Sequence, residues 1–71
     1  MTHSITTDVE LAFRQGIVCF DQGVTKDNLD FRVNSLKSLG GPYVLLAMAY
    51  YDGYIRRKHG LVDENGEEIF R

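Results

Sequence analysis

The chain has 71 residues, a net charge of −2 and a single cysteine, Cys19. A chain of this length forms one domain at most, and its core rarely contributes more than about 3–5 kcal/mol of stability. A lone cysteine excludes a disulfide within the chain and is more typical of a reducing cytoplasm than of secretion. The stretch MTHSITTDVE also lacks the basic residues and the apolar run of a signal peptide. We therefore expect residues 1–71 to form one small cytoplasmic domain.

The first predicted helix covers residues 8–21, after a frayed segment at 1–6. TDVE at 7–10 has the spacing of a capping box, in which Thr7 and Glu10 exchange hydrogen bonds. Leu11 and Val18 form a second, narrow apolar stripe on the polar side of this helix. Because a monomer has little use for such a stripe, it indicates contact with a partner helix. The main apolar face consists of Val9, Ala12, Phe13, Gly16, Ile17, Cys19 and Phe20.

Turn-forming and capping residues define the next two helices. Gly23 suits a left-handed position after the first helix, and Thr25 or Asp27 can cap a second helix over residues 28–39. Gly40, Gly41 and Pro42 stop that helix. Pro42 also suits the first turn of a third helix, predicted over residues 42–58.

The third helix is unusually apolar. Its apolar positions span roughly 160° of the helix, against about 100° for an ordinary surface helix. The uninterrupted apolar run from Tyr43 to Tyr51 spans about 14 Å, too short for a bilayer core of about 30 Å. We thus expect no membrane segment but a core helix that two short helices cannot cover, which favours a homodimer or a protein partner. The candidate dimer-interface residues are Leu11, Val18, Leu45 and Ala49.

The C-terminal stretch GLVDENGEEIFR leaves two alternatives for residues 59–71. Leu61-Val62 and Glu68–Phe70 can pair as a short β-hairpin around Asn65-Gly66, or the segment is a flexible acidic tail. The fold class is therefore mainly α. We expect a compact three-helix domain over residues 7–58, followed by a short C-terminal β-hairpin or a tail.

Patterns for catalysis or metal binding are absent from the sequence. Cys19 has no neighbouring base, His3 falls in the frayed start, and His59 sits at a helix end, where it complements the dipole. No two Cys or His residues share a ligand spacing, and no glycine pattern matches a phosphate-binding loop. We expect no enzymatic activity, no metal and no cofactor.

The stretch IVCFDQGVTKDNLDFRVN, residues 17–34, resembles the helix-turn-helix of bacterial repressors. A small residue, a Gly-Val turn and an apolar residue occupy the expected places, at Cys19, Gly23, Val24 and Leu29. The resemblance implies a DNA-binding transcriptional regulator. Its groove- and phosphate-facing residues would be Thr25, Lys26, Asn28 and Arg32.

The end of the third helix combines tyrosines with basic residues. Residues 31–60 have a net charge of +4 between two segments of −3 each, so this basic run either neutralises the acidic ends or meets a partner. Tyrosine beside arginine is typical of interface hot spots. We therefore predict a small protein-binding factor, an inhibitor or accessory protein of bacterial or phage type, that occupies a partner's surface. DNA binding is the alternative. The predicted interaction face is Tyr50, Tyr51, Tyr54, Arg56, Arg57 and Lys58.

Overall fold

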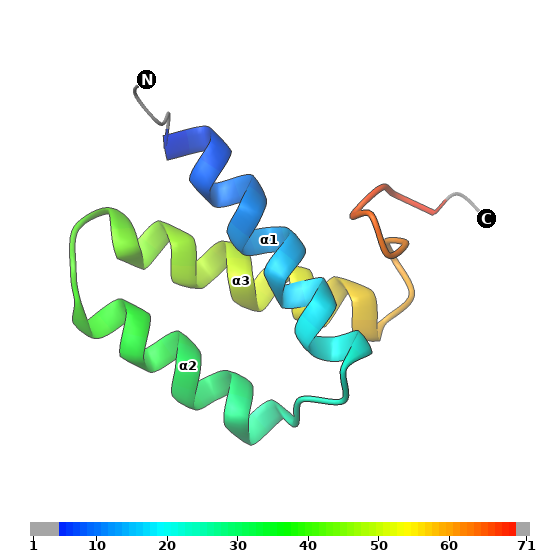
Figure 1. Ribbon diagram of the computed structural model, residues 1–71, viewed down its shortest axis with the longest axis horizontal. Helices are drawn as coiled ribbons and strands as arrows, with labels where there is room; N and C mark the ends of the chain where they lie inside the picture. The colour runs from blue at the N-terminus through cyan, green and yellow to red at the C-terminus, as the bar shows by residue number, and fades with distance from the viewer. Residues whose placement is uncertain (1–4, 70–71) are drawn as a thin grey trace.

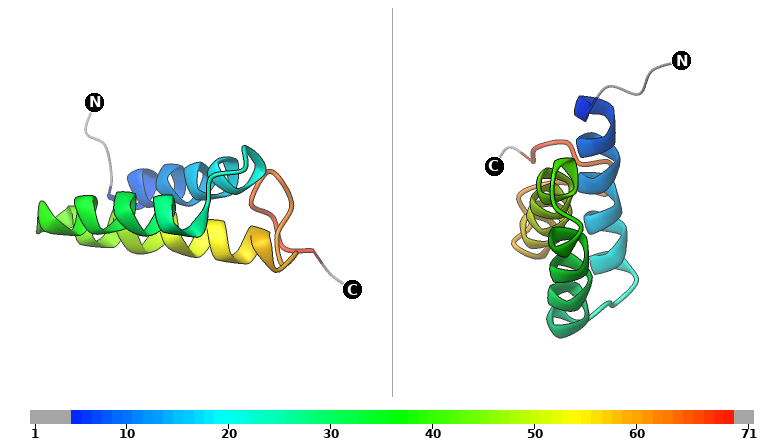
Figure 2. Two further views of the ribbon diagram at one scale, coloured as in Figure 1. Left: turned by 90° about the horizontal axis from the view of Figure 1, so that it is seen from below. Right: turned by 90° about the vertical axis from the view of Figure 1, so that its left-hand side faces the viewer.

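The computed structural model describes the backbone of residues 5–69 and the side chains of residues 8–69. These residues form three helices, α1 (Ile5–Asp21), α2 (Lys26–Ser38) and α3 (Pro42–Lys58), which confirms the mainly α prediction (Figure 1). Both α1 and α2 pack on α3, which is the central element. The domain measures 36 × 30 × 16 Å, so it is thin in one direction, as the two side views in Figure 2 show.

The helix ends follow local signals in most places. The Thr25 side chain caps α2 and accepts a hydrogen bond from the Asn28 backbone N–H at 3.3 Å, so α2 begins at Lys26, two residues earlier than predicted. Gly23 has a φ of +82°, and Pro42 lies in the first turn of α3, both as expected. α1 begins at Ile5, which places Thr7 inside the helix. The predicted capping box therefore does not start this helix, and residues 5 and 6 of the predicted frayed segment are helical.

Two glycines fix the crossing of α1 and α3. A methyl group added to Gly16 would collide with the backbone carbonyl oxygen of Tyr50, and one added to Gly53 would collide with that of Phe13. Glycine inside a helix costs roughly 1 kcal/mol relative to alanine, so its presence at both positions indicates a packing requirement. Here the requirement is direct contact between the two backbones.

The main core cluster lies where α1, α2 and α3 meet. The rings of Phe20 and Tyr54 form an edge-to-face pair with centroids 5.4 Å apart. The Tyr54 hydroxyl donates a hydrogen bond of 2.7 Å to the backbone carbonyl of Val24, which ties the α1–α2 turn to α3. The buried members of this cluster are Cys19, Leu29, Val33, Ala47, Tyr50 and Tyr54.

The predicted C-terminal β-hairpin is wrong. Within residues 60–69 the only strand-like pairing is one isolated antiparallel bridge between Val62 and Glu68. The Asp63 carboxylate accepts hydrogen bonds from the backbone N–H groups of Asn65 (2.9 Å) and Glu67 (3.0 Å), which shape the turn, but no ladder extends from it within the described residues. The segment is instead a compact loop whose Val62 is buried, and Phe70 lies outside the described residues.

Candidate functional site

The predicted tyrosine face is divided between the core and the surface. Tyr50 and Tyr54 are only 7% and 4% exposed, because they point into the core cluster. Tyr51 is partly buried, and the ammonium group of Lys26 lies 6.0 Å from the centre of its ring. The structure therefore offers one of these three tyrosines to a partner.

The basic run is bound largely within the chain. Arg56 pairs with Asp52 at 3.0 Å across one helical turn. Arg57 donates to the Asp21 carboxylate at 2.9 Å and to the Val62 carbonyl at 3.2 Å, which ties the end of α3 to α1 and to the C-terminal loop. Lys58 is exposed. Because both arginines have intramolecular partners, neutralisation within the fold accounts for much of this charge.

A polar cluster joins the three helices beneath this region. The Cys19 thiol and the Tyr50 hydroxyl lie 2.7 Å apart, and the Arg32 guanidinium donates to both, at 3.4 and 3.3 Å. Burial, followed by the hydrogen bond to Cys19, raises the pKa of Tyr50, while Arg32 acts in the opposite direction. Each of the three residues comes from a different helix. The cluster therefore satisfies polar groups inside the core, and it presents no base beside the thiol.

The residues of the DNA-binding hypothesis lie between the N-cap and the middle of α2. All four, Thr25, Lys26, Asn28 and Arg32, are exposed. Two of them have other tasks in the fold, because Thr25 caps α2 and Arg32 reaches back to the Cys19–Tyr50 pair. Lys26 pairs with Asp30 at 3.4 Å, and this carboxylate raises the pKa of Lys26. Both cations that would contact phosphate thus already have partners.

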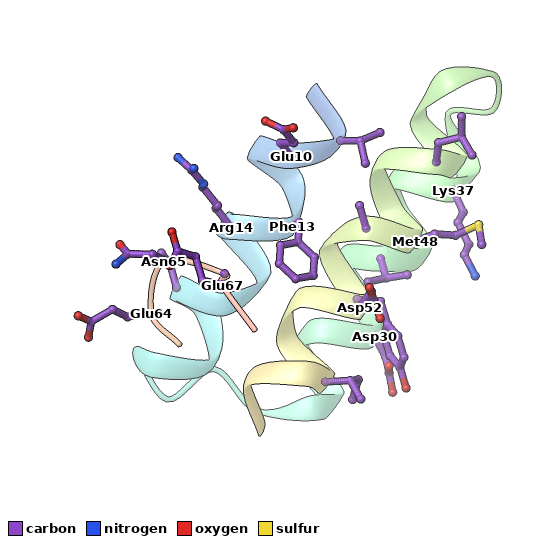
Figure 3. A pocket seen from close by; sticks show the side chains of 18 of the residues that line it. Glu10, Phe13, Arg14, Asp30, Lys37, Met48, Asp52, Glu64, Asn65 and Glu67 are labelled. Atoms are coloured by element: carbon purple, nitrogen blue, oxygen red, sulfur yellow. The ribbon is translucent and has the colours of Figure 1, made fainter. Parts of the chain in front are cut away.

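A broad, open groove of about 1400 Å³ extends over α1, α3, α2 and the C-terminal loop. Figure 3 shows Phe13 pointing into the space between α1 and α3, with Met48 on the other side of α3. Leu45 and Met48 on α3 are 50% and 57% exposed, although both are large and apolar. The main apolar lining is Val9, Phe13, Leu45, Met48, Ala49 and Ile55.

Three of the four candidate dimer residues line this groove. Val18, Leu45 and Ala49 belong to it, whereas Leu11 is exposed outside it. Sequence patterning missed the contributions of Phe13, which was assigned to the core, and Met48. The signal was present in the width of the apolar face of the third helix, which exceeds what α1 and α2 cover.

The groove has a predominantly acidic lining. In Figure 3 Glu64 and Glu67 lie on the far side of α1, and Asp30 and Asp52 lie beside α3, so carboxylates flank the apolar middle on two sides. The cationic lining residues are Arg14 and Lys37. The acidic ones are Glu10, Asp30, Asp52, Glu64 and Glu67.

The described residues contain no group of three or more His, Cys, Asp or Glu side chains placed to hold a metal ion. His59 caps the C-terminal end of α3, and His3 lies outside the described residues. None of the helices in the described part of the chain has the length and apolar character needed to cross a membrane. No protein-family model matches the sequence, and neither a curated protein nor a solved structure matches the chain.

Proposed function

We propose that the chain is a small protein-binding factor, of the inhibitor or accessory type, that receives a segment of its partner in the groove. The observation that supports this most directly is the exposure of Leu45 and Met48 in the middle of a concave surface. Apolar side chains grouped in this way and bordered by charged groups are typical of protein interaction sites.

The size of the groove favours a polypeptide over a small molecule. Small-molecule sites occupy about 300–1,000 Å³ and enclose most of the ligand. The groove measures about 1400 Å³ and is open to solvent. That volume is close to that of about three turns of α-helix, taken as a cylinder about 10 Å across.

The narrower parts of the proposal rest on the sequence. The cytoplasmic location follows from the lone Cys19, and a bacterial or phage origin from small size and the lack of catalytic motifs. Self-association is the competing use of the apolar surface. Leu11, which lies outside the groove, gives a homodimer a contact that would leave the groove free.

Site-specific photo-crosslinking tests the proposal. A photo-reactive phenylalanine analogue replaces Met48 in the groove or, as the control, Phe31, which is 72% exposed outside it. In bacterial extract we expect discrete cross-linked proteins from position 48 only. Excess wild-type protein should compete them away, and excess Met48→Glu should not. Equal, non-competed labelling from both positions would show that the groove is not a binding site.

The DNA-binding alternative has a separate test. Sedimentation of the protein with random-sequence duplex at low salt should show no complex if the chain is a protein-binding factor. A complex that dissociates at high salt, and that is lost in Lys26→Glu, would instead support a regulator acting through residues 25–32.

A further inference from the structure

We infer that the partner segment is an amphipathic α-helix whose polar positions are mainly basic. This inference rests on the proposed function, because it specifies the chemistry of the segment that the groove receives. It draws on three properties of the groove: the unequal charge of its lining, its shape, and the poor fit of a second copy of this chain.

The charge of the lining selects for a cationic partner. Five carboxylates and two cations face the groove. Asp30 and Asp52 are partly neutralised by Lys26 and Arg56, which lie outside the lining. Glu10, Glu64 and Glu67 form no ion pair with any side chain in the described part of the protein. Arg14 and Lys37 of the lining form no ion pair there either, so the three carboxylates outnumber the unpaired cations by one. The apolar middle therefore keeps a small surplus of negative charge, to which basic side chains would be complementary.

The shape of the apolar middle favours a helix over an extended strand. A bound strand gains most of its affinity by pairing with a sheet edge, and residues 5–69 contain no sheet. A helix needs only a groove that accepts anchors at positions i, i+3 or i+4, and i+7. Leu45, Met48 and Ala49 lie three and four residues apart on α3, and all three line the groove, so they provide apolar contacts for such a row.

A second copy of the chain fits this groove poorly. An isologous dimer would place two identical surfaces face to face, so two linings that each hold more carboxylates than cations would repel each other. The basic helix end of the chain does not offer a substitute, since Arg56 and Arg57 are paired with Asp52 and Asp21. The groove is therefore complementary to a chain of different charge pattern.

Three synthetic peptides of about 18 residues, or five turns of helix, test the inference. The first has leucine at helical spacing and lysine at the remaining positions. The second replaces each lysine with glutamate. The third has the composition of the first but contains two central D-leucines that interrupt the helix. Each carries a fluorophore, and binding is followed by fluorescence anisotropy at low and high salt.

We expect the lysine peptide to bind most tightly and to weaken as salt rises. Met48→Ser should weaken it about tenfold, as loss of a central apolar anchor does, whereas the matched exposed control Phe31→Ser should not. Glu67→Gln should weaken binding about threefold, which is typical of an exposed charge at the rim of an interface. Glu68→Gln, the same change one residue outside the lining, should have less effect.

Several outcomes would overturn the inference. Equal binding of the lysine and glutamate peptides would remove the charge preference, and equal binding of the D-leucine peptide would remove the requirement for a helix. If Met48→Ser does not weaken binding of the lysine peptide, that binding reflects general attraction to an acidic protein and not contact with the groove. Absence of binding by all three peptides would also reject the inference. The cross-linking result from position 48 decides separately whether the groove binds protein at all.

Discussion

The two halves of α3 differ in a way that their composition does not suggest. The C-terminal half contains Asp52 and the basic run, yet Tyr50, Gly53 and Tyr54 are buried there. The N-terminal half is almost entirely apolar, yet Leu45 and Met48 are half exposed, and Tyr43 and Val44 are also exposed. Burial in this domain thus depends on where α3 meets its neighbours more than on how apolar each segment is.

The glycine crossing explains the difference. α1 touches α3 at Gly16 and Gly53. Gly16 lies near the middle of α1, whereas Gly53 lies in the C-terminal half of α3. From that point the N-terminal halves of the two helices diverge, as Figure 1 shows. The N-terminal half of α3 is therefore covered less fully than the C-terminal half, and the groove runs over its exposed apolar side chains.

Substitution of the crossing glycines should have the largest effect. In Gly16→Ala and Gly53→Ala the new methyl group meets a backbone carbonyl, so the helices must separate. We expect a loss of about 3 kcal/mol or more, enough to unfold a domain of this size. Far-UV circular dichroism during urea denaturation measures it. Asn34→Ala, at an exposed position of α2, is the control and should be neutral or stabilising. Wild-type stability in Gly53→Ala would show that the helices do not depend on this contact.

Loss of the Tyr54 hydroxyl should have the next largest effect. Tyr54→Phe leaves the Val24 carbonyl without its 2.7 Å hydrogen bond. We expect a loss of about 1–1.5 kcal/mol in the free energy of unfolding. Tyr43→Phe removes the same atom from an exposed tyrosine and should change stability by less than about 0.5 kcal/mol. Equal effects of the two substitutions would mean that the hydrogen bond from Tyr54 to Val24 does not stabilise the domain.

The parts of the fold that were predictable from sequence depend on local chemistry. Thr25, Gly23 and Pro42 mark helix ends through their own backbone and side-chain preferences, so the three helices and most of their bounds followed from them. The Asn65-Gly66 signal identified the turn correctly, and the hairpin prediction failed because a turn signal does not determine how far the flanking residues pair, which here is one bridge.

The groove was only partly predictable because it depends on contacts distant in sequence. The apolar stripes of α3 were identified, but the pattern alone does not show which stripe faces α1. Tyr50 and Tyr54 were consequently predicted to lie on a contact surface, although the structure buries them. The acidic lining comes from α1, α2, α3 and the C-terminal loop, so no single stretch of sequence contains it.

Tyr50 should make the free energy of unfolding of the domain depend on pH. Burial raises the pKa of Tyr50, so the native state keeps this proton to a higher pH than the unfolded state does. Below about pH 10 both states are protonated and the contribution is constant. As the pH rises further, the unfolded state loses its proton first and the native state becomes less stable. Urea denaturation of wild type and Tyr50→Phe across this range should show a steeper loss in the wild type. Parallel curves would mean that Tyr50 ionises equally in both states.

The smallest effect on stability is expected from a substitution in the N-terminal half of α3. Leu45→Ala removes a side chain that is 50% exposed, so little buried contact is lost and alanine suits a helix well. We expect a change within about 0.5 kcal/mol in urea denaturation. Leu29→Ala makes the same change at a fully buried position of α2 and should cost about 2–5 kcal/mol. A comparable cost at Leu45, increasing with protein concentration, would mean that a second copy covers this half of the helix in solution. The greater exposure of the N-terminal half of α3 would then be a property of the monomer and not of the protein in solution.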